Sequence, residues 1–391
     1  MVVGAGWAGL TVARVLRRSA ADLDVTVVDR SAEFRSLPLS NAWLVGLGAE
    51  PRRQDHAATA LAFGYRFVQA EVTSIDRERR VIATRDGTLA YDWLVLAPGV
   101  RNDYKAWFGN DTSAAAAVRE RYPAGVHAEE LAALKRKIAE FKGGDFAMVL
   151  PPGPSRCPPA PYERAVMAAW AFRRRGLKAR ILVIDPGGGM QAFNRVFAER
   201  YADMIVHMTH AQVKAVDPFR RTIATEFDDI GFDDAILMPP QQAADLAWRA
   251  GLVAESAERP SAWAAIDPLR LNVPGDERVF LAGDLIDRVS PLFGQYPKNG
   301  HVASRLGRIV AGEIAARSRG ETAAVALPES VCHVFTDVDP RESVRLEAEY
   351  RLRGDGVITQ AVRQHNEPQP RGEAEAWARS MYAEFLAPEG G

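Results

Sequence analysis

The chain has 391 residues, of which 47% are hydrophobic and 25% charged, and its formal net charge is −1. This length and composition predict a soluble globular protein of two or three domains. The charge balance excludes the basic excess of a nucleic-acid-binding protein, and no apolar run reaches the roughly 18 residues of a membrane-spanning helix. Two cysteines far apart in the sequence exclude CxxC metal sites and CxxCH haem attachment, so no metal is expected.

The N-terminal segment predicts a dinucleotide-binding turn. Residues 2–9 form a strand that runs into a GxGxxG turn, and residues 10–16 continue as a helix. A second apolar strand, residues 25–28, ends at an aspartate at the spacing of about 20 residues that delivers a carboxylate to a ribose hydroxyl. The predicted contacts are Gly4, Gly6, Trp7, Ala8, Gly9, Asp29 and Arg30.

Two later segments resemble the signatures of two-dinucleotide flavoprotein reductases. Residues 88–99 form an apolar strand that ends in a small-residue glycine turn, and residues 279–284 resemble the second FAD signature, whose aspartate contacts the ribityl chain. Together they imply that FAD is the cofactor. The further predicted FAD contacts are Asn41, Val72, Ala97, Pro98, Gly99, Gly283, Asp284, Lys298, Asn299 and Gly300.

The spacing of these segments predicts an α/β fold with two Rossmann-type βαβ domains, as in glutathione-reductase-like flavoproteins. The FAD-binding domain is expected to be split into residues 1–110 and 260–325. A second Rossmann-like domain, residues 111–259, lies between the two parts, and residues 326–391 form a small C-terminal α+β interface domain.

The second Rossmann-like domain has an unusual first turn. Its strand at residues 146–150 and its helix at residues 162–175 are joined by a segment containing Pro151, Pro152, Pro154 and Cys157. Proline lacks the N–H that a phosphate-binding loop requires. We therefore expect a degenerate phosphate loop and no use of NAD(P)H as electron donor.

The cysteine segment, residues 157–164, resembles the active-site segment of the flavoprotein subunit of flavocytochrome c sulfide dehydrogenase, a family related to sulfide:quinone oxidoreductases. The resemblance extends over nearly the whole chain. It includes residues 39–41, 238–241, 263–267 and 296–300, Cys332 and the closing helix at residues 375–382.

This resemblance implies a redox disulfide between Cys157 and Cys332 beside the flavin, with hydrosulfide attacking one sulfur and the electrons passing to FAD. The position of Cys157 just before a helix independently favours a thiolate. The alternative is a stabilising disulfide or two inert buried thiols, and for Cys332 the local sequence is nearly silent.

Three neighbouring side chains have two interpretations each. Glu163, in the first helical turn, is a candidate proton acceptor, although a charge that complements the helix dipole and pairs with Arg164 explains it equally well. Lys298 is expected to point at the flavin ring from a helix N-terminus, and a surface turn is the alternative. His333, next to Cys332, is a candidate base, but the favoured interpretation is an exposed, non-catalytic histidine in a connecting segment.

The sequence indicates the electron acceptor less clearly than it indicates the cofactor or the cysteine pair. Leu37 stands where flavocytochrome-type relatives have the cysteine that attaches FAD, so we expect non-covalent FAD. The expected acceptor is a c-type cytochrome subunit or soluble cytochrome c, and the substrate a small inorganic sulfur compound. The alternatives are a sulfide:quinone oxidoreductase and a non-catalytic electron-relay subunit.

The cellular location follows only from the resemblance and from a disulfide that re-forms in an oxidising compartment, which together imply the periplasm. The chain opens within its first predicted strand, so residues or a leader ahead of Met1 are compatible with the sequence. The apolar stripe of the last helix, Trp377, Met381 and Phe385, is expected to pack over the flavin domain and to make no membrane contact.

Overall fold

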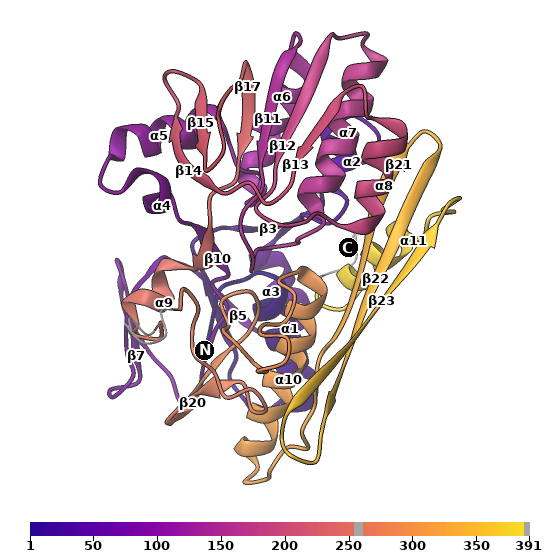
Figure 1. The fold of residues 1–391 in the computed structure, drawn as a ribbon. Coiled ribbons are helices and arrows are strands. Elements are labelled where there is room, and N and C mark those ends of the chain that lie inside the picture. Colours follow the sequence, from indigo (N-terminus) through magenta and orange to yellow (C-terminus); the bar gives the residue numbers. More distant parts are fainter. Residues whose placement is uncertain (254–260, 387–391) are drawn as a thin grey trace.

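The computed structural model describes residues 1–253 and 261–386 (Figure 1). Two α/β units lie one above the other in the view of Figure 1, and a C-terminal sheet runs along one side of both. The predicted fold class is therefore confirmed. The predicted boundary between residues 259 and 260 and the end of the predicted C-terminal domain, residues 387–391, lie outside the described residues.

The lower unit is built on a six-stranded sheet, in the order β19-β20-β9-β1-β2-β5, that combines residues before 100 with residues after 270. Leu94 pairs with Val279 and Leu96 with Leu281 in parallel register, so the two predicted FAD-binding segments share one sheet. The bounds are β1 Val2–Val3, β2 Thr26–Asp29, β5 Arg66–Gln69, β9 Leu94–Leu96, β19 Asn272–Val273 and β20 Asp276–Leu281.

Helices α1 (Trp7–Ser19) and α10 (Gly300–Ser318) pack against each other beside this sheet. Their contact requires glycine, since a Cβ on Gly307 would come within 2.6 Å of the Ala8 carbonyl oxygen. This close packing brings the N-terminus of α10 next to the glycine-rich turn that precedes α1. The predicted helix at residues 10–16 is present as α1 and extends beyond its predicted ends.

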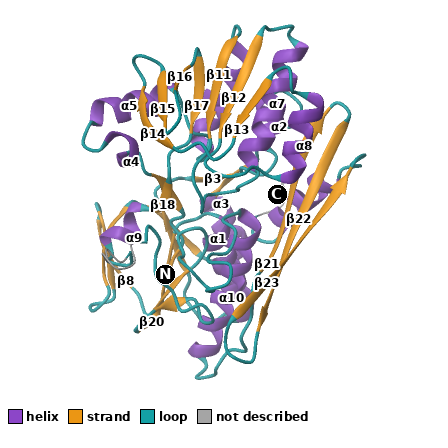
Figure 2. Cartoon of the chain, in the orientation of Figure 1, coloured by secondary structure: helices purple, strands orange, loops and turns teal. Residues whose placement is uncertain are grey.

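The upper unit contains four parallel strands in the order β13-β12-β11-β17. Strands β11, β12 and β17 end in runs of buried apolar residues, the pattern of a parallel sheet covered on both faces. From β11 to β13, strands and helices alternate along the chain, and the helices flank the strands of this sheet (Figure 2). The bounds are β11 Gly144–Val149, β12 Ala179–Ile184, β13 Ile205–Met208, β17 Asp234–Leu237, α5 Thr112–Arg121, α6 Leu131–Glu140, α7 Ala160–Arg174 and α8 Gln191–Arg200.

The C-terminal region forms a three-stranded antiparallel sheet, β21 (Glu329–Val338), β22 (Arg341–Leu352) and β23 (Ile358–Glu367), followed by α11 (Glu373–Ala383). Phe385 is fully buried and its ring lies 4.9 Å from that of Trp7. Met381 is also buried. The predicted inward packing of the apolar stripe over the lower unit is therefore confirmed.

The remaining elements are short and surround the two units. In the described part of the chain, no helix is long and apolar enough to cross a membrane. The bounds are β3 Glu33–Arg35, α2 Ser40–Leu44, β4 Arg53–Asp55, α3 His56–Phe63, β6 Val72–Asp76, β7 Val81–Thr84, β8 Gly87–Ala90, β10 Val100–Asn102, α4 Lys105–Phe108, η1 Ala128–Glu130, β14 Val213–Asp217, β15 Thr222–Thr225, β16 Asp229–Gly231, β18 Gln241–Ala243 and α9 Asp245–Arg249.

Candidate functional site

A cavity of about 750 Å³ is lined by residues of the lower unit, the upper unit and the C-terminal sheet. This volume is within the range of small-molecule and cofactor sites. The cavity includes the three predicted catalytic residues, Cys157, Cys332 and Glu163. It also includes all the predicted cofactor contacts except Gly9 and Lys298, namely Gly4, Gly6, Trp7, Ala8, Asp29, Arg30, Asn41, Val72, Ala97, Pro98, Gly99, Gly283, Asp284, Asn299 and Gly300.

The glycine-rich turn leaves one side of the cavity free of side chains. A Cβ on Gly6 would have no heavy atom within 4 Å, whereas one on Gly4 would lie 2.4 Å from the Ala97 carbonyl oxygen. Gly9 does not line the cavity but allows close backbone packing, because a Cβ added there would lie 1.9 Å from the Gly4 carbonyl oxygen. The three glycines thus permit close approach of a ligand, a tight turn and strand–helix packing, as a dinucleotide site requires.

The two later signatures line the cavity next to the glycine-rich turn. Gly99 has a φ of +73° and Gly283 a φ of +89°, conformations that favour glycine. Asp284 accepts a hydrogen bond of 2.9 Å from Nε of Arg156, which belongs to the proline-rich turn of the upper unit. These features fit FAD, the cofactor that the fold implies, and add Arg156 as a cavity residue that the sequence reasoning missed.

The two cysteines meet at this cavity. Cys332 is 8% exposed on β21, and both Cys157 and Cys332 line the cavity. Interaction with the Cys157 side chain, followed by burial, raises the pKa of Cys332 well above its ordinary value. Both residues are free thiols, so the disulfide stays a prediction.

The loop of Cys157 is held in an unusual backbone conformation. Cys157 has a φ of +47°, which a residue other than glycine rarely adopts. Its N–H donates a hydrogen bond of 2.6 Å to the Lys298 carbonyl oxygen, and the preceding N–H, of Arg156, donates to Oε1 of Gln241 at 2.7 Å. The segment before α7 is therefore tied to two other parts of the fold, which fixes where the thiol points.

Glu163 lies buried beside the cysteine pair. Its two oxygens accept hydrogen bonds from Nδ2 of Asn41, at 2.6 Å, and from the Phe335 N–H, at 2.8 Å. Burial outweighs these bonds and the neighbouring Arg164, and it raises the pKa of Glu163 from 4.5 to about 7. A carboxyl with this pKa exchanges a proton readily at neutral pH.

Asn41 connects Glu163 to Arg164. Its Oδ1 accepts from Nε of Arg164 at 3.0 Å, while Nδ2 also donates to the Ala160 carbonyl oxygen at 3.0 Å. Arg164 is 4% exposed and also donates to the carbonyl oxygens of Ala124 and Gly125. The polar groups of Asn41, which also lines the cavity, thus organise the first turn of α7.

The Lys298 side chain does not point at the cavity as expected. Its ammonium is buried, donates to the carbonyl oxygens of Asp284 and Ile286 at 2.7 and 3.0 Å, and lies 3.7 Å from the ring centroid of Trp263. Burial lowers the pKa of Lys298 to about 7. Neither sequence interpretation describes this residue, since it is neither aimed into the cavity nor in a surface turn.

His333 also departs from the prediction. It is 8% exposed and lies within β21, directly after Cys332, and its ring centroid is 5.6 Å from that of Trp377. A second histidine, His301, lines the cavity and accepts from the Val331 N–H at 3.2 Å. Burial lowers the pKa of His301 to about 4, so it is neutral at neutral pH.

The nucleotide end of the upper sheet is filled by side chains. Asp185, at the carboxyl end of β12, is 2% exposed. Its carboxylate accepts from the Tyr162 hydroxyl at 2.7 Å and from the Gly187 N–H at 2.7 Å, and contacts Nε2 of His207 at 2.9 Å. In an open parallel sheet, this position is where a second dinucleotide would be bound.

Comparison with known proteins agrees with this architecture. Residues 131–239 match the family model of the central part of the sulfide dehydrogenase [flavocytochrome c] flavoprotein chain. Residues 1–120 match the pyridine nucleotide-disulphide oxidoreductase family. A type II NADH:quinone oxidoreductase of Staphylococcus haemolyticus is 30% identical over 106 residues, which span 26% of this chain and 26% of that protein.

Among solved structures, the sulfide:quinone oxidoreductase of Aquifex aeolicus has a TM-score of 0.77 at 20% identity, covering 99% of this chain and 92% of that chain. The NDH2 of Plasmodium falciparum has a TM-score of 0.70 at 12% identity, covering 99% and 94%. An NAD-dependent persulfide reductase of A. fulgidus has a TM-score of 0.63 at 18% identity, covering 98% and 76%. These likenesses concern the fold.

The family matches confirm the resemblance found in the sequence. The cysteine segment, α7 and Asp185 all lie within the matched central part. The N-terminal glycine-rich turn and residues 97–99 lie within the other match. Residues 131–239 are therefore similar to the central part of flavocytochrome c sulfide dehydrogenase flavoprotein chains, and residues 1–120 to pyridine nucleotide-disulphide oxidoreductases.

Proposed function

We propose that this protein is an FAD-dependent sulfide dehydrogenase that oxidises sulfide to sulfane sulfur at Cys157 and Cys332. The observation that carries the proposal is that both cysteines, from segments far apart in the sequence, line one cavity of cofactor size together with Glu163. A stabilising disulfide needs no cavity, and inert thiols need no proton-exchanging neighbour. Here the two cysteines line a cavity and have such a neighbour in Glu163.

In the proposed reaction, hydrosulfide attacks one sulfur of the Cys157–Cys332 disulfide. The disulfide bond breaks, a new S–S bond forms in a cysteine persulfide, and the other cysteine leaves as a thiolate. A second hydrosulfide takes the outer sulfur as hydrodisulfide, which leaves the cysteine pair as a dithiol. Bound FAD supplies the two-electron oxidation that returns the dithiol to the disulfide.

Glu163 is the proposed proton acceptor for this chemistry. Its pKa of about 7 leaves a substantial fraction ionised at neutral pH, and its charge acts on the Cys332 thiol. Asn41 and the Phe335 N–H hold the carboxylate in place. The interpretation of Glu163 as only a helix-dipole partner does not explain why it is buried next to the thiols.

We further propose that NAD(P)H is not the electron donor. The turn that would bind its pyrophosphate contains several prolines, and the acidic residue that would bind its ribose, Asp185, is already bonded to Tyr162 and to the Gly187 N–H. Addition of NADH under anaerobic conditions should leave the flavin spectrum unchanged, and flavin reduction by NADH would disprove this part of the proposal.

The proposed acceptor is a c-type cytochrome on a separate chain, in the periplasm, with FAD bound non-covalently. The inward packing of Phe385 and Met381 supports an acceptor that docks from solution. A quinone is the second candidate, because Leu37 lines the cavity at the place of the FAD-attaching cysteine of flavocytochrome-type relatives.

Anaerobic addition of sulfide, followed by a soluble cytochrome c or a soluble quinone, tests the proposal. We expect sulfide to bleach the flavin and the cytochrome to restore it without added quinone. Reoxidation by the quinone alone would establish the second candidate. In the Cys157→Ser variant the bleaching should be lost, and unchanged bleaching would instead leave the protein as a relay subunit without cysteine catalysis.

A further inference from the structure

Strand β21, which carries Cys332, contacts both α/β units. It packs against α10 of the lower unit and against α7 and α8 of the upper unit. Figure 1 shows the C-terminal sheet extending from beside α10 to beside α8. The position of Cys332 relative to Cys157 therefore depends on how β21 is fastened at its two ends.

The first end of β21 is fastened next to the Cys157 loop. Nδ2 of Asn299 donates to Oγ of Ser330 at 3.3 Å, and the Val331 N–H donates to Nδ1 of His301 at 3.2 Å. The neighbouring Lys298 carbonyl oxygen accepts from the Cys157 N–H. One short segment of the lower unit, residues 298–301, thus holds the backbone on both sides of the cysteine pair.

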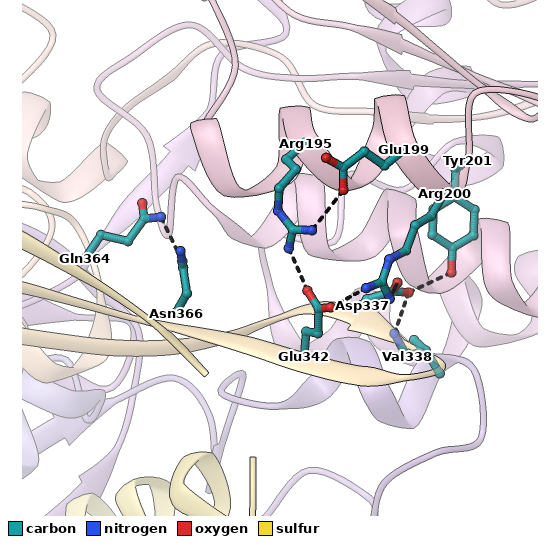
Figure 3. A network of polar contacts seen from close by, with 9 residues as sticks. All are labelled: Arg195, Glu199, Arg200, Tyr201, Asp337, Val338, Glu342, Gln364 and Asn366. Carbon is teal, nitrogen blue, oxygen red and sulfur yellow. Dashed lines mark hydrogen bonds and ion pairs between the residues drawn. The ribbon is translucent and has the colours of Figure 1, made fainter. Parts of the chain in front are cut away.

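The second end of β21 is fastened to α8 by a cluster of charged side chains (Figure 3). Oδ2 of Asp337 accepts from Nη1 of Arg200 at 2.6 Å, and Oδ1 accepts from the Tyr201 hydroxyl at 2.9 Å. Glu342, on β22, accepts from Arg195 at 2.6 Å and is also bonded to Arg200. We name this set, Arg195, Arg200, Tyr201, Asp337 and Glu342, the α8 clamp.

Burial of the Asp337 and Glu342 carboxylates means that the α8 clamp favours a single register of β21 and β22 on α8. The side chain of Asp337 is 0% exposed and that of Glu342 is 11% exposed. A buried carboxylate needs its partners, so β21 and β22 cannot shift along α8 without leaving charge unpaired. Such buried ionic groups are well suited to fixing register, more than to adding stability.

The α8 clamp lies too far from the thiols to touch them. Asp337 follows Cys332 by five positions on β21, which is roughly 16 Å along an extended strand. Between them, the Phe335 N–H donates to Glu163. A displacement of β21 at the clamp would therefore be transmitted first to the proposed proton acceptor and then to Cys332.

We propose that Arg200, through Asp337 and Glu342, is a positioning residue that sets the placement of Cys332 against Cys157. The effect of this placement on sulfide oxidation rests on the proposed function. The positioning of Cys332 by the α8 clamp does not. Displacements of about 1 Å far from a reacting centre cost up to about 100-fold in rate. We expect loss of the clamp to weaken the Cys157–Cys332 pairing roughly tenfold.

The test is the thiol–disulfide equilibrium of the full-length protein with its FAD, in glutathione redox buffers without sulfide. Free thiols are alkylated and the disulfide fraction is measured by mass. We expect the equilibrium constant for the Cys157–Cys332 disulfide to fall roughly tenfold in Arg200→Gln and to recover in part in Arg200→Lys. Glu342→Gln, which keeps Arg200 and Asp337 paired, should give a smaller fall in the same direction.

The matched control is Arg180→Gln. It removes a two-bond ion pair with Asp145 in the same unit, at 2.7 and 2.6 Å, without touching β21 or β22. Its equilibrium constant should equal that of the wild type. Equilibrium constants within about twofold of the wild type in both Arg200→Gln and Glu342→Gln would overturn the proposal.

If Arg200→Gln fails to fold, Glu342→Gln decides the question by the same criterion. A wild-type protein that forms no Cys157–Cys332 disulfide in any glutathione buffer would also overturn the proposal. The sulfide titration described above is a separate experiment. If sulfide does not reduce the flavin, the proposed function is refuted. If the disulfide equilibrium constant nevertheless falls in Arg200→Gln, the positioning role of Arg200 still holds.

Discussion

Replacing Glu163 by Gln removes one ionisable group beside the cysteine pair and keeps the size of the side chain. With a pKa of about 7, Glu163 is about one tenth ionised at pH 6 and about nine tenths ionised at pH 8. If the carboxylate takes up the proton released during cysteine chemistry, the wild-type rate follows this fraction. The variant has no such dependence.

The quantity to measure is the rate constant of flavin reduction by sulfide in anaerobic stopped flow, for wild type and Glu163→Gln between pH 6 and pH 8. The ionisation of sulfide is common to both proteins and cancels in the ratio of the two rate constants. We expect this ratio to rise about tenfold, with its midpoint near pH 7. Glu313→Gln, a change at a buried carboxylate of α10 outside the cavity, should show the wild-type profile.

The same substitution has a consequence for stability. Because burial is the main cause of the raised pKa, the folded state disfavours ionised Glu163, and the difference between 4.5 and about 7 corresponds to about 3 kcal/mol. The folded protein binds more protons here than the unfolded chain between these two values, so stability falls as the pH rises. Relative to the variant, the wild type should lose about 2–3 kcal/mol of unfolding free energy between pH 5 and pH 8.

Urea unfolding at the two pH values measures this difference. Hydrogen bonds that Gln fails to reproduce change the unfolding free energy of the variant by the same amount at pH 5 and at pH 8. They therefore do not affect how the difference between wild type and variant changes with pH. A rate ratio that stays flat from pH 6 to pH 8 would refute the role of Glu163 as proton acceptor. An unfolding difference that does not change with pH would refute the raised pKa itself.

Three further outcomes are expected. After denaturation and ultrafiltration, all of the FAD should pass into the filtrate, since Leu37 forms no thioether. Flavin retained with the polypeptide would contradict non-covalent binding. Phe385→Ala should cost about 3–5 kcal/mol of unfolding free energy, because the fully buried ring contacts Trp7 and Phe34, and a loss below about 1 kcal/mol would show that the C-terminal segment is not docked as described. Arg156→Gln should weaken FAD binding in a fluorescence titration through loss of its bond to Asp284, and unchanged affinity would place Arg156 outside the cofactor site.

Local patterns were sufficient for the parts of the fold that are local. The glycine spacing from Gly4 to Gly9, the strand that ends at Asp29 and the proline-rich turn at Cys157 each depend on a few consecutive residues, and each predicted the structure that is present. The two flavoprotein signatures predicted one FAD-binding domain built from distant segments, and β9 and β20, which carry them, pair in one sheet.

The parts that could not be predicted depend on contacts between distant segments. The short sequence before Cys332 resembles a connection, and only pairing with β22 makes it a buried strand that also covers His333. The direction of the Lys298 side chain follows from carbonyl groups at 284 and 286, which no local pattern reveals. The bond between Arg200 and Asp337 likewise depends on how β21 packs on α8.

The central claim is that the cysteine pair transfers electrons from sulfide to the flavin. The most direct measurement is an anaerobic sulfide titration of the FAD absorbance in the wild type and in Cys332→Ser, whose flavin site is otherwise unchanged. We expect full bleaching of the wild-type flavin and no bleaching of the variant. A wild-type flavin that stays oxidised, or a variant that bleaches as fast as the wild type, would contradict it.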